Sequence, residues 1–245
     1  MYKEHRDFEL PENNPKIWRY MDFTKFMDML DKESIFFTRS DKFQDKFEGT
    51  YPKLNKTFRT HLYTNQLHTL NPKKREEVIQ SFDDFEEKFK IFRRWVVINC
   101  WHMNEYESAA MWNLYLKSEE GIAIQSNIER LIKSFEKSQE TVHIGKVEYK
   151  DYNIDIIPEG RLYLPFMNKR ISFGHEQELR VLHQLDPKDT VEYGISIKCD
   201  LSELIEKIYV APTAPDWLFN LVDSMCKKFN LKVDVVRSEL SELPR

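Results

Sequence analysis

Apolar residues recur along the chain at two spacings, that of strands and that of helices. The predicted strands span residues 17–20, 35–37, 95–101, 121–124, 143–149, 178–183, 194–198, 207–211 and 232–236. Helices are predicted after Asp22 and over residues 72–94, 105–116, 127–137 and 215–229, with a helical piece at 166–173. Because strands and helices do not alternate strictly, the pattern indicates an α+β fold. We expect a single domain over residues 1–245, with a mixed or antiparallel central sheet flanked by helices.

A helical insertion is expected at residues 52–94. Within it, Val78, Phe82, Phe85, Phe89 and Phe92 follow one another at steps of 4, 3, 4 and 3, which places them on one face of a helix. The opposite face mixes acidic and basic residues. This pattern is typical of an amphipathic helix packed on its own domain, and the same stripe over residues 76–94 could instead bind a partner protein.

Composition excludes several classes of function. The chain carries 37 Lys and Arg against 41 Asp and Glu, which gives a formal charge of −4. This charge excludes a protein that coats nucleic acid non-specifically. A hydrophobic fraction of 41% and an aromatic fraction of 13% are enough to build a core. The chain has 6 glycines, and no two lie closer than Gly160 and Gly174. This excludes a Walker loop, a G-x-G-x-x-G fingerprint and a G-x-S-x-G elbow, all of which need clustered glycines.

The cysteines, the histidines and the lengths of the apolar runs indicate the cellular location and bear on metal binding. The 3 cysteines are widely spaced, so no disulfide framework or C-x-x-C pair is predicted, and a reducing cytoplasm fits best. The 7 histidines form no metal-binding motif, and no metal cofactor is expected. Residues 1–10 lack the apolar core of a signal peptide, and no stretch approaches the roughly 18 apolar residues of a membrane span. The expected location is therefore the cytoplasm.

The first candidate site lies in the run His-Glu-Gln-Glu-Leu-Arg at residues 175–180. If this run is a strand, Glu176, Glu178 and Arg180 share one face, with neighbouring carboxylates about 6 to 7 Å apart. Two coupled carboxylates beside a cation could hold ribose hydroxyls or stabilise a positively charged sugar. The alternative is an ion-pair ladder on the sheet with Lys169 and Arg170.

The second candidate site combines a polar loop with an early strand. Asp45 and Glu48 lie in the loop that follows the strand at 35–37, and Arg19 and Tyr20 lie in the strand at 17–20. Loops next to a rigid strand often carry binding residues. The alternative is that the loop only stabilises itself, with Asp45 bonding backbone amides and Phe47 filling the core.

A third group is aromatic. Trp112 and Tyr115 lie at helical spacing with Met111, and Trp101 precedes them in a strand. Residues spaced in this way are usually core. The alternative is that Trp112 or Tyr115 stacks on a base or a nicotinamide ring.

The order of these pieces resembles the prokaryotic domain of unknown function family numbered 2971, over nearly the whole chain. The segments that carry the resemblance are Trp18-Arg19-Tyr20, Phe36-Phe37, Asp45-Lys46-Phe47-Glu48, Cys100-Trp101, Ala110-Met111-Trp112-Asn113-Leu114-Tyr115, Gly121-Ile122-Ala123-Ile124, Lys169 and Glu176-Gln177-Glu178-Leu179-Arg180. The chain departs from that family at Lys46, where proline is usual. The resemblance implies an accessory or phage-defence role and no established reaction.

The order of elements also looks like that of ADP-ribosyltransferases. In that analogy Arg19 and Tyr20 hold the nicotinamide side of NAD, Trp112 or Tyr115 stacks on it, and Glu178 steadies the positive sugar. The analogy concerns the layout of the fold.

Three functions follow from these patterns. The first is an enzyme that uses NAD as substrate and transfers ADP-ribose or cleaves the glycosidic bond, with Glu178 assisted by Glu176. The second is a non-catalytic module that binds a nucleotide, nucleic acid or partner protein through Arg180 and the aromatic helix. The third is a nuclease in which Asp45, Glu48, Glu176 and Glu178 hold Mg²⁺.

Overall fold

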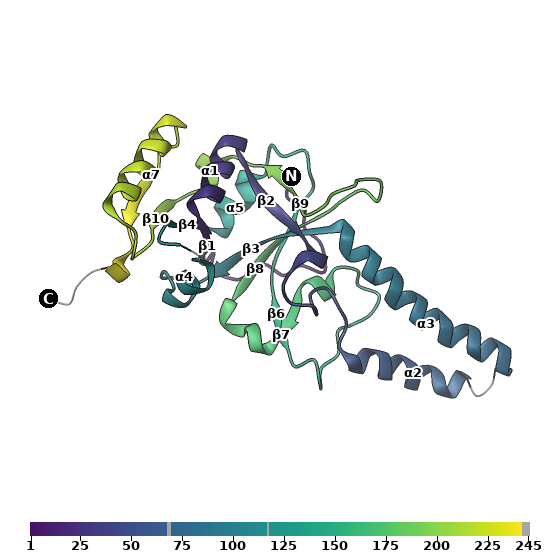
Figure 1. Cartoon of the computed structure of the whole chain (residues 1–245). Helices are drawn as coiled ribbons and strands as arrows, with labels where there is room; N and C mark the ends of the chain where they lie inside the picture. Colours follow the sequence, from purple (N-terminus) through teal and green to yellow (C-terminus); the bar gives the residue numbers. More distant parts are fainter. Residues whose placement is uncertain (68–69, 117, 242–245) are drawn as a thin grey trace.

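The central sheet has nine strands, as a computed structural model of residues 1–67, 70–116 and 118–241 shows (Figure 1). The strands are β1 (Lys16–Asp22), β2 (Ser34–Arg39), β3 (Val96–Met103), β4 (Gly121–Asn127), β5 (His143–Lys146), β8 (Glu178–Gln184), β9 (Gly194–Lys198), β10 (Lys207–Val210) and β11 (Asp234–Arg237). Their order is β11-β10-β4-β1-β3-β2-β9, with β8 paired to β3 and β5 paired to β8. Only β10 and β11 pair in parallel among these described strands. The chain is thus one α+β domain with a mixed, mostly antiparallel sheet, which confirms the prediction.

Helices surround this sheet, and a small second sheet joins β6 (Glu148–Lys150) to β7 (Asn168–Arg170) in parallel. The α-helices are α1 (Phe23–Lys32), α2 (Lys53–Leu67), α3 (Pro72–Phe92), α4 (Ala109–Tyr115), α5 (Ile128–Ser134), α6 (Leu201–Leu204) and α7 (Asp216–Lys228). Short 3-10 helices include η1 (Ser40–Lys42), η3 (Leu164–Phe166) and η4 (Ile171–Glu176). Within the described residues, every helix is too short or too polar to cross a bilayer.

Side-chain caps explain where several helices begin. The side chains of Asp22, Asn71, Ser108 and Asn127 each accept a hydrogen bond from a backbone amide in the first turn of α1, α3, α4 and α5. Such caps satisfy amides that have no partner within the helix. The caps expected at Asp22 and Asn127 are therefore confirmed, and the helix predicted from residue 105 begins later because Ser108 is its cap.

Two predicted elements differ from the structure. The strand expected over residues 143–149 is two strands, β5 and β6, which belong to different sheets. The helical piece expected at 166–173 begins at the last residue of η3 and contains the strand β7 and the start of η4. Pairing with β6 holds β7 extended, and this contact between distant segments has no local sequence signal. Helix α2 lies within the helical insertion expected at residues 52–94, although no separate bounds were predicted for it.

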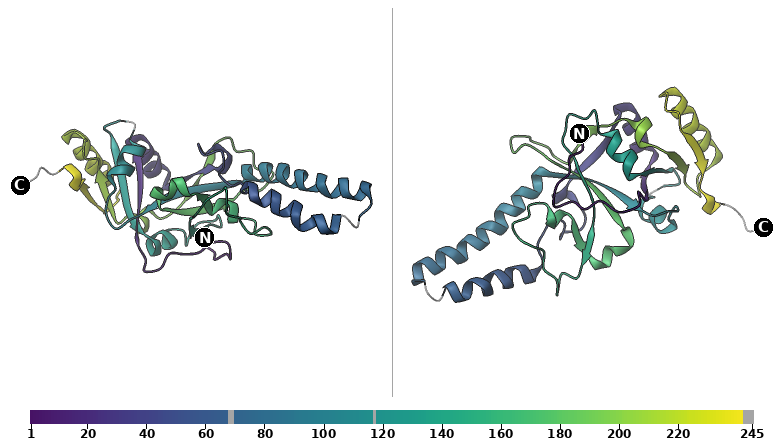
Figure 2. Two further views of the ribbon diagram at one scale, coloured as in Figure 1. Left: turned by 90° about the horizontal axis from the view of Figure 1, so that it is seen from below. Right: turned by 180° about the vertical axis from the view of Figure 1, so that it is seen from behind.

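The α2–α3 hairpin extends from one end of the molecule, and α1, α5 and α7 lie toward the other end (Figures 1 and 2). The predicted stripe of α3 is buried only where the helix meets the body, at Phe89. There Phe89 packs in a small core with Phe166. Farther out, the Arg59 guanidinium of α2 lies 5.2 Å from the centre of the Phe85 ring, which remains partly exposed. The hairpin thus covers part of its own apolar stripe.

Two strands, β1 and β2, pair with the same edge of β3 at the centre of the sheet. β2 pairs with the beginning of β3, and β1 pairs with its end. Between these two paired stretches, side-chain hydrogen bonds join β3 to β2 and to β1. Asn99 Nδ2 donates to the Phe36 carbonyl oxygen at 2.8 Å, and Arg19 Nη1 donates to the Cys100 carbonyl oxygen at 2.7 Å. On its other edge β3 pairs with β8 over the whole length of β8.

Candidate functional site

Five charged side chains from three separate segments meet beside β8. We call Glu48, Lys169, Glu176, Glu178 and Arg180 the buried charge network. At its centre the Arg180 side chain is 0% exposed. Its Nη1 and Nη2 donate to the two carboxylate oxygens of Glu48 at 2.6 and 2.8 Å, and its Nε donates to Glu178 Oε2 at 2.6 Å. The bidentate contact with Glu48 and the bond to Glu178 together fix the plane of the guanidinium group between the two acids.

Lys169 joins the remaining two acids. Its Nζ donates to Glu178 Oε1 at 2.9 Å and to Glu176 Oε2 at 2.5 Å. The same ammonium lies 4.6 Å from the centre of the Phe173 ring, a distance suited to a cation–π interaction. Glu178 is therefore held by two cations, whereas Glu176 is held by Lys169 alone among the described cations.

Backbone geometry brings these groups together. β8 pairs with β3 so that Glu178 lies opposite His102 and Arg180 lies opposite Cys100, which puts all four side chains on one face of the sheet. The expectation that Glu176 continues the same strand is wrong. Glu176 ends η4, and Gln177 adopts a left-handed conformation with φ 41° before β8 begins. Glu176 therefore reaches Lys169 from outside the strand.

Glu48 reaches the network from the loop after η1. The loop turns where the Glu48 amide donates to the Asp45 carbonyl oxygen at 3.0 Å, and Lys46 lies within this turn. The next residue, Gly49, has φ 61° and lies against the Phe166 ring. A carboxylate buried in this way is stable because Arg180 neutralises it.

The network contains three carboxylates and only two cations, so one negative charge is in excess. Burial raises the pKa of Glu176, the neighbouring Glu178 also raises it and Lys169 lowers it, which together place it at about 7. Burial also opposes ionisation of Glu178, but Arg180, Glu176 and Lys169 together lower its pKa to about 2. Below about pH 7 the two acids therefore hold one proton between them, on Glu176, and above it that proton is lost.

Glu178 and Glu176 also differ in exposure, and the acid with the higher pKa is the more exposed one. The Glu178 side chain is 5% exposed, and the Glu176 side chain is 12% exposed at the outer end of the network. Burial raises the pKa of Glu48, which Arg180 counteracts. Burial also raises the pKa of the neighbouring Cys100 thiol to about 12, so this thiol stays protonated.

Asp45 lies in a second ion pair next to the network. Its Oδ1 accepts a hydrogen bond from Arg170 Nη2 at 2.8 Å and another from the Phe47 amide at 3.0 Å. This agrees with the loop-stabilising interpretation of Asp45. The accompanying expectation that Phe47 fills the core is wrong, because Phe47 is 41% exposed and its ring lies 4.5 Å from the Arg170 guanidinium.

The aromatic candidates divide between core and surface. Trp112 is buried against Tyr20, with ring centres 4.9 Å apart, and its Nε1 donates to Glu107 Oε2 at 2.8 Å. The Tyr20 hydroxyl accepts a hydrogen bond from the Ser108 amide at 2.8 Å. Both rings are thus packed and locally satisfied, as the core alternative predicts.

Tyr115 is the exposed member of the aromatic group, at 43%. Burial of its hydroxyl raises its pKa, and so do Cys100 and the carboxylates of Glu178 and Glu176. Arg19 acts on the same hydroxyl in the opposite direction. Tyr115 thus lies within electrostatic reach of both acids and of Arg19.

His102 was not predicted to belong to this site. Its Nδ1 lies 2.7 Å from the Glu176 carbonyl oxygen, and because a carbonyl can only accept, Nδ1 carries the proton. Burial lowers the pKa of His102, so the ring is neutral near pH 7. Its Nε2 is buried without a hydrogen-bond partner among the described residues. No spacing in the sequence connects His102 to Glu176, because the pairing of β3 with β8 creates the contact.

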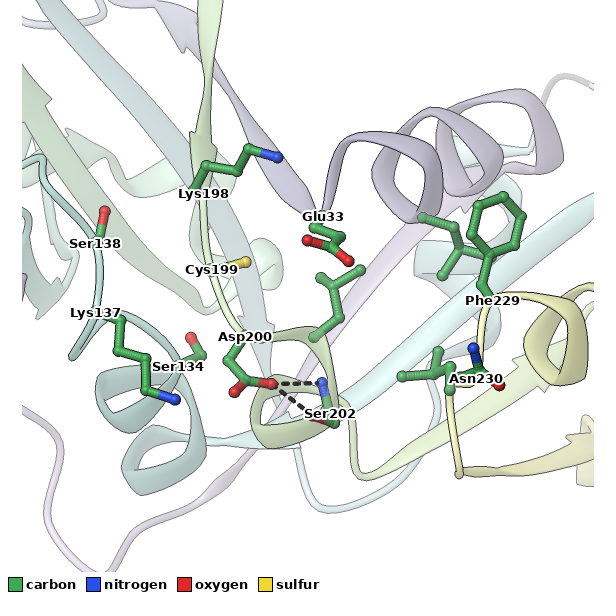
Figure 3. A pocket seen from close by; sticks show the side chains of 13 residues that line it. Glu33, Ser134, Lys137, Ser138, Lys198, Cys199, Asp200, Ser202, Phe229 and Asn230 are labelled. Atoms are coloured by element: carbon green, nitrogen blue, oxygen red, sulfur yellow. Dashed lines mark hydrogen bonds between the residues drawn. The ribbon is translucent and has the colours of Figure 1, made fainter.

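A pocket of about 440 Å³ is lined by a different set of residues (Figure 3). It lies where α1, α5 and α7 end, and its walls include Glu33, Ser134, Lys198, Asp200 and Phe229. None of the residues proposed from the sequence lines it. The charge network and this pocket are thus two separate features.

No protein-family model, curated protein or solved structure matches this chain. The resemblance to the family numbered 2971 and the analogy to ADP-ribosyltransferases therefore stay predictions.

Proposed function

We propose that this chain is an enzyme that cleaves the glycosidic bond between nicotinamide and ribose in NAD, and passes the ADP-ribose group to water or another acceptor. The observation that carries the proposal is the pair Glu176 and Glu178, whose pKa values lie at about 7 and about 2 on a shared lysine. Carboxylates that differ in this way can divide the work of a reaction, one holding a charge and the other exchanging a proton.

The roles of the two acids follow from their exposure. Glu178 is enclosed by Lys169 and Arg180, so its assigned role is to fix these cations and to keep the pKa of Glu176 high. Glu176 lies at the outer end of the network and is the acid that contacts the substrate. This reverses the order of importance expected from the sequence, in which Glu178 met the sugar.

The chemical step needs one base. The bond between ribose C1′ and the nicotinamide nitrogen breaks, and its electron pair leaves with neutral nicotinamide. An acceptor oxygen forms the new bond to C1′, and its proton passes to the Glu176 carboxylate. A base with a pKa near 7 is well matched to this transfer at neutral pH. The partly exposed ring of Tyr115 supplies a surface on which the departing ring can stack.

The other two proposals from the sequence use the same side chains differently. A nuclease would need the carboxylates of Asp45, Glu48, Glu176 and Glu178 as metal ligands. In the structure these carboxylates are hydrogen-bonded to Arg170, Arg180 and Lys169. A binding module would use the same face without turnover.

The test measures NAD consumption and ADP-ribose formation by chromatography, with protein and nucleic-acid acceptors present. We expect wild type to consume NAD and Glu176→Gln to be about a hundredfold slower. Glu105→Gln is the matched control, because Glu105 is exposed and lies outside the network. The wild-type rate should rise with pH through about 7 as Glu176 ionises.

Two outcomes would overturn the proposal. One is that wild type consumes no NAD with any acceptor, and saturable NAD binding in that case would support the binding module. The other is that Glu176→Gln turns over NAD as fast as Glu105→Gln does.

A further inference from the structure

The backbone turns sharply between the two acids of the pair, Glu176 and Glu178. Glu176 ends η4, Gln177 has φ 41°, and Glu178 begins β8. A left-handed conformation is unfavourable for a residue with a side chain, so it persists where contacts with the surrounding structure hold it. The direction in which the Glu176 side chain leaves the backbone therefore depends on the contacts that hold this turn.

Two residues at the end of β3 hold the turn. His102 Nδ1 donates to the Glu176 carbonyl oxygen at 2.7 Å, and the Met103 amide donates to the Gln177 carbonyl oxygen at 2.8 Å. The pairing of β3 with β8 places His102 opposite Glu178 and so brings its ring to the turn. The Met103 bond joins two backbone groups and does not depend on the side chain at that position. The His102 bond does, and a carbonyl that loses its donor inside the protein is destabilised.

The His102 ring acts on Glu176 through position rather than through charge. The residue is 8% exposed, and burial lowers the pKa of its imidazole, so the ring is neutral near pH 7. A neutral imidazole has a single N–H group, and here that group donates to the Glu176 carbonyl oxygen. Exchanging His102 for a neutral amide therefore changes hydrogen bonds and leaves the charges of the site as they are.

The Glu176 carboxylate lies between the buried charge network and water. The charged and titratable groups around it are Lys169 of β7, Glu178 of β8, Tyr115 of α4, Tyr149 of β6 and, next to it in η4, His175. Lys169 Nζ donates to the carboxylate at 2.5 Å, and the Glu176 side chain is 12% exposed. A small shift of the Glu176 backbone would thus take the carboxylate away from Lys169 and into water.

We propose that His102 is a positioning residue, which holds the Glu176 backbone so that the Glu176 carboxylate stays at Lys169 inside the buried charge network. This inference deepens the function proposed above, and it rests on that function only for its effect on NAD turnover. Without the His102 donor the turn relaxes and the carboxylate reaches water, where it ionises more readily. Glu176 then becomes a weaker base.

Two substitutions separate the roles of the two ring nitrogens. In His102→Asn the amide nitrogen lies as many bonds from Cβ as Nδ1 does, so it can still donate to the Glu176 carbonyl oxygen. In His102→Gln the amide nitrogen lies as many bonds from Cβ as Nε2 does, and the donor at the Nδ1 position is lost. His183→Gln is the matched control, because His183 Nδ1 donates to the Thr141 carbonyl oxygen at 2.7 Å, outside the network.

The measurement is a ¹³C NMR titration of Glu176, with glutamate labelled at the side-chain carboxyl carbon and the signal assigned by its loss in Glu176→Gln. Wild type, His102→Asn and His183→Gln should titrate with a midpoint at about pH 7. In His102→Gln the midpoint should fall by about one pH unit or more, toward the 4.5 of a free glutamate side chain. The pH profile of NAD turnover should shift in the same direction in this variant.

A second measurement needs no substitution. The ¹⁵N chemical shifts of the His102 ring in wild type should show a neutral ring with its proton on Nδ1 at pH 7. Each of four results would disprove the positioning role: a proton on Nε2, an unchanged or higher midpoint in His102→Gln, an equal fall in His102→Asn, and an equal fall in His183→Gln.

The two NMR measurements do not depend on turnover. If wild type consumes no NAD but the Glu176 midpoint falls in His102→Gln alone, the positioning role stands and the proposed function fails. If wild type consumes NAD but the midpoint stays unchanged in His102→Gln, the proposed function stands and the positioning role fails.

Discussion

Replacing Glu176 by glutamine should make the protein more stable at alkaline pH. The amide can still accept a hydrogen bond from Lys169 and donate one to Glu178, as the protonated acid does, but it cannot ionise. In wild type the pKa of Glu176 rises from 4.5 to about 7 on folding, chiefly because the side chain is buried. The folded state therefore binds more protons than the unfolded state between these two pH values.

The sign and size follow from proton linkage. Where the folded state binds more protons, the free energy of unfolding falls as pH rises, so wild type loses stability across this window and the variant does not. At about 1.4 kcal/mol for each pH unit between the two pKa values, the loss reaches about 3 kcal/mol. The two proteins should thus differ little near pH 4.5 and by up to about 3 kcal/mol at about pH 8.

The assay is urea unfolding followed by tryptophan fluorescence at several pH values, with the difference between variant and wild type plotted against pH. Trp18, Trp101 and Trp112 are buried and report on the core. Glu105→Gln, at an exposed acid, is the control and should give a flat difference. If Glu176→Gln also gives a flat difference, or is less stable than wild type at the alkaline end, the excess negative charge of the network is not located at Glu176.

Two further substitutions test the support of the network. Arg180→Ala should lower the free energy of unfolding by about 3 to 5 kcal/mol, because it leaves the buried carboxylates of Glu48 and Glu178 without their shared partner. Urea unfolding measures this loss. A loss below about 1 kcal/mol, the size expected for a surface ion pair, would contradict the prediction. Gly49→Ala should lower the thermal unfolding midpoint and reduce the free energy of unfolding by about 1 to 3 kcal/mol. The reason is that Gly49 has φ 61° and an added Cβ would lie 2.4 Å from the Phe166 ring. Gly174→Ala is its control, because nothing lies within 4 Å of a Cβ there, and equal midpoints for the two variants would refute the steric argument.

Most of the local structure could be predicted from the amino-acid sequence alone. Asp22 and Asn127 begin helices because their side chains bond amides only three residues ahead, and this interaction is complete within one turn. Apolar runs such as that at residues 95–101 form strands because they are buried on both faces of the sheet. These signals depend on neighbours in the chain, and they are sufficient for the α+β class.

Which charged side chains meet depends on the folding of distant segments against one another. Lys169 lies in β7, which is extended because it pairs with β6, and Glu48 reaches Arg180 from 132 residues away. Alternation along a strand predicted a shared face for Glu178 and Arg180, but the left-handed backbone at Gln177 removed Glu176 from that strand. The pKa difference between the two acids arises from burial and from the count of nearby cations, which are properties of the packed molecule. A spacing in the sequence cannot record them, because the groups that cause them come from segments far apart in the chain.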